Sequence, residues 1–460
     1  MSTYPYLPSA GYERLPREYP VGEAFLARYG GMSRGALEDL QERRFAAVLD
    51  AAWDTPFYRK LWGEAGVRRA DVRGLADLDR LPIVDKDAVM ADLAAHPPFG
   101  SLAARDHGPA AQVLQTTSGT TGSPQPVLWG SWGREVQNAL LGRTYQWVGV
   151  GRGDTAHSVY GHGTVNGGHY VREALVRFTD ALLLSAGTGN ETSSQRQVAM
   201  MNQFGVTVLV GFADYLRRLA EVARDAGLEP GRDIPVRLIV GHLPHGARAS
   251  LEADWPGARA HDWYGVADTG VLAAEGPERA GQWLWEDANV VELLDPDTYA
   301  PVADGEPGNL VVTSLGKSDV APLIRFDTHD LSAVLTDAAA HDLPFRRIAG
   351  LLGRSDQMVK LRGINVYPTA LAGLVSDVEG GTGEYYCRLE RRPDGAEHLV
   401  VVVESARAAD GDARLADDLA GSLATALGVK VGVELVGPGR TAETTGLLTR
   451  QKPLRLVDAR

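Results

Sequence analysis

Apolar residues recur at helical spacing near the start of the chain and gather in short runs through its middle. Between residues 33 and 65 they lie three or four positions apart, which predicts a helix that Thr55-Pro56 ends. Later, apolar runs at 181–184, 206–210 and 236–240 alternate with helical patterns at 193–204, 214–226 and 247–255. Because strands that alternate with helices form βα units, this part of the chain is expected to build a largely parallel sheet.

Three features of the same pattern precede that sheet. Val113-Leu114 and Val127-Leu128-Trp129 predict two buried strands on either side of a polar loop. Residues 134–150 predict an amphipathic helix. Residues 1–32 are rich in Pro, Tyr and Gly and show no clear period, so we expect them to wrap the surface as an arm.

After residue 269 the pattern changes to short strands separated by turns. Strands are predicted at 283–285, 290–294, 310–314, 324–326 and 332–335. The separators Asp295-Pro296-Asp297 and Asp304-Gly305-Glu306-Pro307-Gly308 have the composition of turns. This part of the chain therefore predicts a small β-barrel-like subdomain or a β-meander.

The pattern of apolar and polar residues changes again near Gly353-Arg354-Ser355-Asp356. The remaining pattern predicts a strand at 385–390, a strand at 398–404, a helix at 412–427 and a strand at 430–436. Pro393-Asp394-Gly395 is expected to form the hairpin turn between the first two strands. The segment therefore predicts a compact α+β domain.

Composition and charge narrow the class of protein. With 460 residues the chain is too long for one hydrophobic core, so two or three domains are expected. The net charge of −13 argues against a nucleic-acid partner, whose phosphates would need a basic face. The sequence has no run of eighteen apolar residues and no signal-peptide pattern, so we expect a cytoplasmic protein without a membrane partner. The single Cys387 excludes an internal disulfide and a cysteine-clustered zinc site.

The polar loop between residues 115 and 126 has the residue types of an anion-binding loop. Its glycines can take positive φ and let the backbone approach a ligand, while hydroxyls and amide N–H groups offer donors suited to phosphate. The central residues are Thr117, Ser118, Gly119, Thr120, Thr121 and Gly122. No lysine follows the second glycine, so this is not the GxxxxGK[ST] loop. On composition alone, an ordinary surface loop stays the alternative.

A second polar, glycine-rich stretch runs from Tyr160 to Tyr170. Tyr160, His162, Asn166 and His169 offer stacking and hydrogen bonds, and the glycines allow a ligand to approach closely. The stretch is therefore a candidate lining of a substrate pocket. The alternative is a glycine-loosened helix start with solvated histidines.

Seven motifs besides the loop occur in an order and spacing that resemble a known family. They are Thr55-Pro56-Phe57-Tyr58, Leu81-Pro82, Trp285-Glu286-Asp287, Asp304-Gly305-Glu306, Pro322-Leu323-Ile324-Arg325, Gly353-Arg354-Ser355-Asp356 and the run from Arg362 to Pro368. On these motifs the chain resembles an adenylate-forming enzyme of the acyl-CoA synthetase superfamily, in its phenylacetate-CoA ligase-like branch. The resemblance implies an α/β fold with a large N-terminal adenylation domain, residues 1–355, and a small mobile C-terminal lid, residues 356–460.

The resemblance also implies roles for the residues that match the family's motifs around ATP. The loop residues 117–122 would hold the β- and γ-phosphates, and Tyr264 and Gly265 would lie along the adenine. Asp268 stands where the family has a magnesium-binding Glu, and its shorter carboxylate can still bind a hard cation. In isolation, Asp268 would as readily be a turn or capping carboxylate.

Four more positions match residues of the ribose site, the hinge and the lid. Asp330 matches the aspartate that accepts both ribose hydroxyls, and Arg354 matches an arginine near ribose and phosphate. Asp356 matches the hinge about which the lid rotates. Lys452 matches the catalytic lysine, a point charge for carboxylate and α-phosphate oxygens. The alternatives are a turn carboxylate for Asp330 and a solvated tail for Lys452.

The chain departs from the family pattern at several positions. Ser123 replaces a phosphate-loop Lys, His329 replaces a Gly, and Ala372 replaces a Glu. The resemblance implies that Gly241 and His242 line the acyl pocket, and in the segment from them to Gly246, Leu243 removes a carboxylate near that pocket. Seven of the eleven histidines fall between residues 157 and 329. These departures indicate an unusual acid, or an acceptor other than CoA.

The sequence therefore predicts a ligase that uses ATP and Mg²⁺ to adenylate an aromatic carboxylic acid. The acyl group would pass to CoA or to another small-molecule nucleophile. One alternative is adenylation of nitrite and its coupling to an arylamine, which gives a diazo product. Another is a non-catalytic relative that binds nucleotide without turnover. The oligomeric state is left open, with a homodimer among the expectations.

Overall fold

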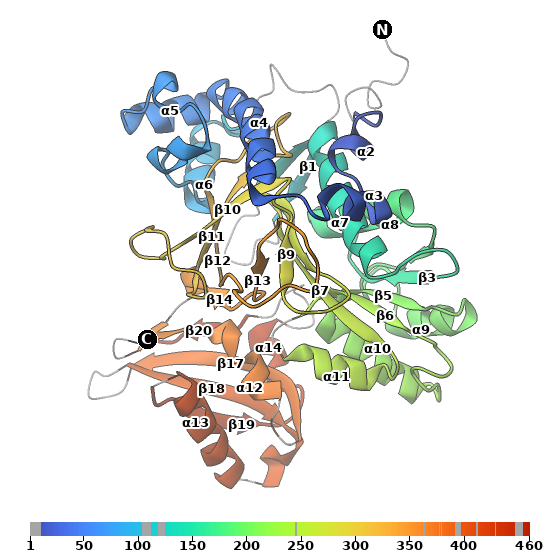
Figure 1. Ribbon diagram of the computed structural model, residues 1–460. Coiled ribbons are helices and arrows are strands. Elements are labelled where there is room, and N and C mark those ends of the chain that lie inside the picture. The colour runs from blue at the N-terminus through green and yellow to red at the C-terminus, as the bar shows by residue number, and fades with distance from the viewer. Residues whose placement is uncertain are drawn as a thin grey trace. The chain divides into compact units, whose positions relative to one another are not determined.

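The computed structural model describes the chain apart from residues 1–10, 104–111, 118–124, 244–245, 358, 362–363, 377, 379, 392–396, 411–412, 428 and 447–453. The chain divides into two compact units (Figure 1). The first comprises Met1–His242, Glu252–Thr328 and Ser332–Gly350, and the second comprises Leu243–Leu251, His329–Leu331 and Leu351–Arg460. The domain boundary at residues 355 and 356 stays a prediction.

Helices make up the beginning of the first unit. They are α2 (Leu15–Glu18), α3 (Gly22–Tyr29), α4 (Arg34–Trp53), α5 (Pro56–Glu64) and α6 (Lys86–Ala95). Thr55 Oγ1 accepts a hydrogen bond from Tyr58 N at 3.2 Å, so Thr55 caps α5 and Pro56 is its first residue. The predicted stop at Thr55-Pro56 is confirmed, because proline fits the first turn of a helix and cannot continue one.

The N-terminal arm is not the surface segment that its composition predicted. Leu15, Tyr19, Phe25 and Tyr29 are all buried, with Phe25 and Tyr29 fully so. Their side chains join the large core cluster that also contains Trp285. The described part of the arm, residues 11–32, therefore belongs to the core of the first unit.

An eight-stranded sheet forms the centre of the first unit. Its order is β13-β9-β8-β7-β6-β5-β3-β4. The strands are β3 (Thr155–Ser158), β4 (Leu182–Ser185), β5 (Val208–Phe212), β6 (Leu238–His242), β7 (Arg259–Val266), β8 (Gly270–Glu275), β9 (Gln282–Leu284) and β13 (Arg347–Ile348). From β4 to β7 neighbouring strands are parallel, as the βα pattern predicted, and β8, β9 and β13 extend the sheet antiparallel.

Helices precede and connect the parallel strands of this sheet. They are α7 (Ser131–Trp147), α8 (Asn166–Phe178), α9 (Ser194–Gln203), α10 (Ala213–Asp225) and α11 (Ala247–Asp254). The expectation that the segment 134–150 is amphipathic is wrong, because α7 is buried on nearly all sides, including the charged Glu135 and Arg143. It packs against α3, α8, β2 and β8, so little of its surface meets solvent.

Two smaller sheets complete the strands before the C-terminal segment. β1 (Gln112–Thr116) pairs antiparallel with β2 (Pro126–Gly130). β10 (Asn289–Leu294), β11 (Gly308–Ser314), β12 (Phe326–Ser332) and β14 (Gly353–Arg354) form a four-stranded sheet in that order. The predicted strand at 332–335 is wrong, because beyond Ser332 only an isolated bridge joins Val334 to Ile348. The barrel-like closure of this region stays a prediction.

The second unit ends in a four-stranded sheet of order β19-β18-β17-β20. From residue 359 onward, the helices and strands of this unit are β15 (Val359–Leu361), β16 (Ile364–Val366), α12 (Ala372–Ser376), β17 (Gly381–Arg391), β18 (Glu397–Ser405), α13 (Ala413–Leu427), β19 (Gly432–Val436), α14 (Ala442–Thr445) and β20 (Leu456–Asp458). The predicted ββαβ order is confirmed, and β17 pairs antiparallel with β18. The predicted turn at 393–395 lies outside the described residues.

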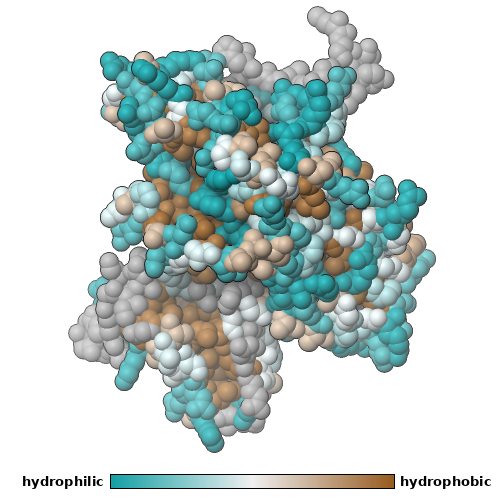
Figure 2. All heavy atoms as spheres, viewed as in Figure 1, coloured by the Kyte–Doolittle hydropathy of each residue, from teal (hydrophilic) through white to brown (hydrophobic). Residues whose placement is uncertain are grey.

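Among the helices that the structure describes, none combines the length and the apolar character needed to cross a bilayer. Figure 2 shows hydrophilic residues over α4 and α5 on the visible face. The cytoplasmic location and the homodimer stay predictions.

Candidate functional site

Two hydrogen bonds join Thr117 and Gln125, the described residues on either side of the predicted anion-binding loop. Thr117 N donates to Gln125 O at 3.0 Å, and Gln125 N donates to Thr117 Oγ1 at 3.1 Å. β1 and β2 pair directly below, with Thr116 opposite Pro126. The predicted phosphate-binding residues Ser118, Gly119, Thr120, Thr121 and Gly122 lie outside the described residues. β1 itself is not the buried strand we expected, since Leu114 is 51% exposed.

Asp268 lies between β7 and β8 and contacts the base of this loop. Its Oδ1 accepts a hydrogen bond from Gln125 Nε2 at 2.5 Å. Burial raises the pKa of Asp268 above its ordinary value, although the charge of Lys317, the hydrogen bond from Gln125 and the charge of Lys86 oppose that shift. A carboxylate with this pKa is poorly solvated and would gain from a bound cation.

Lys317 is a buried cation at this site that the sequence reasoning missed. It is 3% exposed, and its Nζ donates to the backbone oxygen of Asp268 at 2.9 Å. The same Nζ lies 4.4 Å from the centroid of a Trp129 ring, a cation–π distance. Burial lowers the pKa of Lys317 to about 8, while the charges of Asp268 and Asp319 act to raise it.

The oxygen atoms here fit a magnesium ion that also binds substrate phosphates. Within the described residues, no group of three or more His, Cys, Asp or Glu could hold a metal by itself. Asp268 is followed by Thr269, whose Oγ1 is buried without a hydrogen-bond partner. Mg²⁺ prefers oxygen ligands and is commonly held by one or two carboxylates together with phosphates. The site is therefore suited to a metal–nucleotide complex rather than to a metal ion alone.

Tyr264 and Gly265 lie on β7, where the strand turns toward Asp268. Tyr264 is 3% exposed and belongs to a core cluster with Leu272 and Leu284. A Cβ on Gly265 would meet the backbone oxygen of Gly270 at 2.6 Å, so the close approach of β8 requires glycine there. The predicted contact of this segment with adenine stays a prediction.

The second unit brings together Asp330, Arg354 and Asp356. Arg354 Nη1 donates to Asp330 Oδ1 at 2.7 Å, and Nε and Nη2 donate to the two oxygens of Asp356 at 2.9 and 2.7 Å. Asp330 and Arg354 are directly opposite in the β12–β14 pairing. The residues predicted for ribose and hinge are thus joined through one guanidinium, and Asp330 is 4% exposed.

Two of the predicted pocket residues pack in an aromatic cluster. The ring of Tyr160 lies 4.9 Å from that of Phe212, and the ring of His242 lies 4.2 Å from that of Trp263. A Cβ on Gly241 would meet the backbone oxygen of Gly211 at 1.8 Å, so glycine permits close pairing of β5 and β6. These side chains form an aromatic cluster that includes the phenol of Tyr160 and the imidazole of His242.

Three other predicted pocket residues lie just before α8 or in its first turn. His162 Nε2 and Ser185 Oγ are 2.9 Å apart, and His169 Nε2 lies 2.7 Å from Gly163 O. The two imidazole centroids are 6.2 Å apart, and burial together with the charge of His169 lowers the pKa of His162. Asn166 is 2% exposed, and its Nδ2 is buried without a partner. The stretch from Tyr160 to Tyr170 therefore contains the start of a helix, as one alternative held, and also a cluster of polar side chains.

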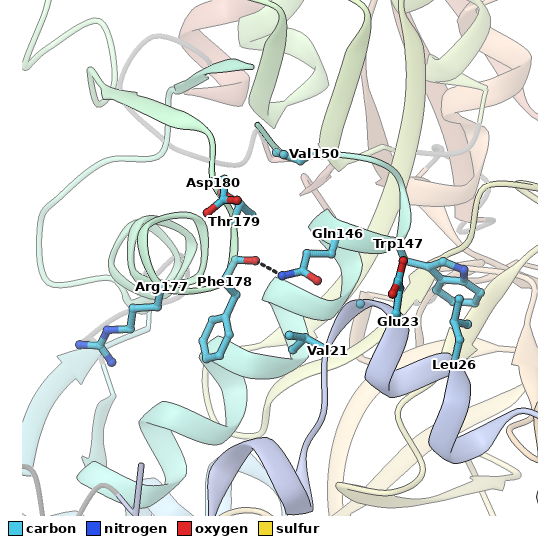
Figure 3. Close-up of a pocket in the computed structure, with 12 residues that line it drawn as sticks. Val21, Glu23, Leu26, Gln146, Trp147, Val150, Arg177, Phe178, Thr179 and Asp180 are labelled. Carbon is cyan, nitrogen blue, oxygen red and sulfur yellow. Dashed lines mark hydrogen bonds between the residues drawn. The ribbon is translucent and has the colours of Figure 1, made fainter. Parts of the chain in front are cut away.

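A pocket of about 560 Å³ lies elsewhere in the first unit (Figure 3). Residues of α3, the end of α7 and the end of α8 line it, and Gln146 Nε2 donates across it to Phe178 O. None of the predicted site residues lines this pocket. Lys452 and the Arg362-Gly363 pair lie outside the described residues.

The chain is similar in sequence to known proteins. Residues 363–460 match the family model of the AMP-binding enzyme C-terminal domain. The chain is similar to a phenylacetate-coenzyme A ligase of Thermus thermophilus, with 31% identity over 441 residues, 90% of this chain and 96% of the relative. It is 29% identical to a phenylacetate-coenzyme A ligase of Escherichia coli over 440 residues, 92% of this chain and 95% of the relative.

A solved structure shows the same fold. It is the structure of a 2-hydroxyisobutyryl-CoA ligase in the postadenylation state, in complex with R3-HIB-AMP. That protein is 25% identical to this chain in sequence, and the two structures match with a TM-score of 0.79. The match covers 97% of this chain and 92% of that chain. The match covers both units, so the α/β fold with a C-terminal α/β domain is confirmed. With its motifs in order and a relative this similar along almost its full length, the chain belongs to the adenylate-forming superfamily, in the phenylacetate-CoA ligase-like branch.

Proposed function

We propose that this protein adenylates an aryl carboxylic acid with ATP and then transfers the acyl group to CoA. The observation that carries the proposal is the hydrogen bond from Gln125 to Asp268, which joins the anion-binding loop to a poorly solvated carboxylate. The relatives named phenylacetate-coenzyme A ligases support the acid class and the acceptor.

The first half-reaction needs positioning and charge stabilisation more than covalent chemistry. A carboxylate oxygen of the acid bonds to the α-phosphorus, the bond from that phosphorus to the bridging oxygen breaks, and pyrophosphate leaves. The loop that begins at Thr117 would hold the β- and γ-phosphates. Asp268 would hold the magnesium ion, which neutralises the phosphate charge as the leaving group develops. Arg354 would orient the nucleotide beside Asp330.

The second half-reaction exchanges the catalytic groups at the adenylate. The thiol of CoA attacks the acyl carbon, a thioester forms, and AMP leaves. We propose that the C-terminal lid turns about Asp356, so that Lys452 gives way to the Arg362-Gly363 face. Solved relatives in complex with an acyl-adenylate and CoA support a sequence of such states.

The test measures pyrophosphate release from ATP in the presence of magnesium. Aromatic acids and nitrite are tried one at a time, and each is tested with and without CoA or an arylamine. An aromatic acid should release pyrophosphate without an acceptor, and CoA should then yield a thioester and AMP. If every acid leaves ATP intact while calorimetry shows ATP binding, the non-catalytic alternative is correct.

The nitrite alternative is favoured by the cluster of polar groups at His162, His169 and Asn166. Small hydrogen-bonding side chains suit a small anion better than a bulky apolar acid. In that reaction a nitrite oxygen would displace pyrophosphate, the arylamine nitrogen would attack the activated nitrogen, and AMP would leave. Pyrophosphate release with nitrite but with no aromatic acid would replace the leading proposal.

We expect Asp330→Ala to weaken selection for the ribose hydroxyls. Its buried carboxylate would accept both hydroxyls of ATP, and hydrogen bonds to a charged group contribute about 1.5–3 kcal/mol. Wild-type protein should therefore use ATP at least about tenfold better than 2′-deoxy-ATP, in kcat/KM for pyrophosphate release. The variant should show similar values for the two nucleotides. A variant that retained the wild-type ratio would contradict the assignment.

A further inference from the structure

Gln125 joins two parts of the site that are far apart in the sequence. Its backbone closes the loop through Thr117, and its side chain reaches Asp268 on the turn after β7. Gln125 is 2% exposed, so water does not compete for its amide. Any displacement of the base of the loop therefore moves a donor that holds the carboxylate.

Lys317 holds the same carboxylate-bearing turn from the other side. Its Nζ bonds to the backbone oxygen of Asp268, which leaves the carboxylate oxygens to other partners. The stem of Lys317 packs on the first turn of α7, because a Cβ on Gly133 would meet its Cγ at 3.6 Å. Burying an ammonium costs free energy, so an apolar residue would serve better if packing were its only role.

Asp319, two residues after this lysine, binds the start of α7. Its Oδ2 accepts a hydrogen bond from Trp132 N at 2.9 Å and lies 3.3 Å from Gly133 N, so it caps the helix in place of Gly130. A Cβ on Gly130 would meet Asp319 Oδ2 at 2.1 Å, so glycine is required for this approach. Asp268 is thus held between the loop and the start of α7.

We propose that Gln125 and Lys317 are positioning residues that set the place of Asp268 relative to Thr117, and thereby the affinity for a magnesium–triphosphate complex. This inference rests on the proposed function. A triphosphate whose magnesium ion is bound by Asp268 needs that carboxylate at a fixed distance from Thr117, where the loop that would hold its phosphates begins. The two side chains hold that separation before the ligand arrives, which lowers the cost of ordering the site.

The proposal is specific to ligands that engage both the loop and Asp268. AMP has no β- or γ-phosphate and should not depend on their separation. A purely structural role would instead weaken AMP and triphosphate binding together and lower the thermal stability of the protein.

The experiment measures binding by calorimetry for two probes, AMP and the magnesium complex of an ATP analogue with a methylene bridge between the α- and β-phosphates. The variants are Gln125→Leu, Lys317→Met and Lys317→Arg. Controls are Gln203→Leu and Lys60→Met, whose side chains are exposed on α9 and α5. Melting temperatures are recorded for every variant.

We expect Gln125→Leu and Lys317→Met each to raise the Kd of the magnesium–analogue complex about tenfold or more, the effect of losing a hydrogen bond to a charged group. The Kd of AMP should change less than about twofold. Lys317→Arg keeps a cation and donors, so it should recover part of the loss. The two control variants should match the wild type.

Two results overturn the inference while leaving the proposed function intact. In one, the wild type binds the magnesium–analogue complex and Gln125→Leu and Lys317→Met bind it equally well. In the other, these variants lose affinity for AMP and for the complex by the same factor, with Lys317→Arg giving no recovery. Failure of the wild type to bind either probe would overturn the proposed function, and this inference with it.

Discussion

Replacing Asp287 by Ala should lower the free energy of unfolding of the first unit by about 3–5 kcal/mol, because it leaves Arg143 as a buried charge without its partner. Both side chains are fully buried. Arg143 Nη1 and Nη2 donate to the two carboxylate oxygens of Asp287 at 3.0 Å each, and Tyr29 OH donates to Oδ2 at 2.8 Å. Urea unfolding followed by tryptophan fluorescence measures the change.

The pair also makes the stability depend on pH in a stated direction. Burial by itself would raise the pKa of Asp287, but the charge and hydrogen bonds of Arg143 hold that pKa below its ordinary value. A lowered folded-state pKa contributes stability above the unfolded-state pKa, and this contribution is lost as the pH falls through the folded-state pKa. The wild type should therefore lose more stability than Asp287→Ala on acidification below about pH 4.

Two comparisons separate the buried charge from other effects of the substitution. The double variant Arg143→Met with Asp287→Leu removes both charges and should recover most of the lost free energy. Asp418→Ala breaks an ion pair whose side chains are 91% and 73% exposed, and should cost less than about 1 kcal/mol. An Asp287→Ala variant as stable as Asp418→Ala would show that the pair contributes little.

The same pair explains why the N-terminal arm was mispredicted. α2 and α3 are short, and each buries only one or two large side chains, so no period appears in a window of helical length. The partner of Tyr29 is Asp287, 258 residues away. Only the tertiary structure reveals that separation, so local pattern favoured a surface arm.

Helix α7 shows a different limit of the hydrophobic pattern. Its polar residues indicated a solvent-facing side, because a buried helix is normally apolar all round. In the structure Glu135 is paired with Arg177, and Arg143 is paired with Asp287. Paired charges can be buried, so polarity in the sequence did not identify the exposed face of this helix.

The sequence identified those residues of the candidate site that stand in motifs whose order along the chain matches the family. Asp330, Arg354 and Asp356 were identified from motifs, and the structure joins them because β12 and β14 are neighbours. Gln125 and Lys317 act on Asp268 from 143 and 49 residues away. Neither residue belongs to a sequence motif whose spacing predicts a contact with Asp268, so only the three-dimensional structure could reveal the two contacts.

Replacing Lys452 by Ala should reduce pyrophosphate release by at least about 10²-fold, the loss typical of removing a group that stabilises developing charge. Residue 452 lies outside the described residues, but both ends of its segment are fixed in the second unit. Leu454 N donates to Thr445 O at 2.9 Å, and Arg455 Nη1 donates to Glu384 Oε2 at 2.9 Å. The chain is therefore anchored in the second unit on the C-terminal side of residues 447–453, and Leu454 is bonded back to Thr445 on the N-terminal side.

The decisive measurement compares the two half-reactions in one variant. Lys452→Ala should still convert a supplied acyl-adenylate and CoA to thioester and AMP at a rate close to the wild type, because that step does not use the ammonium. Lys430→Ala removes an exposed lysine of the same unit and should leave both steps unchanged. Equal losses in both half-reactions would indicate a damaged lid, and undiminished pyrophosphate release would exclude Lys452 from adenylation. A loss confined to adenylation is the result that requires the lid to present different residues to the two steps.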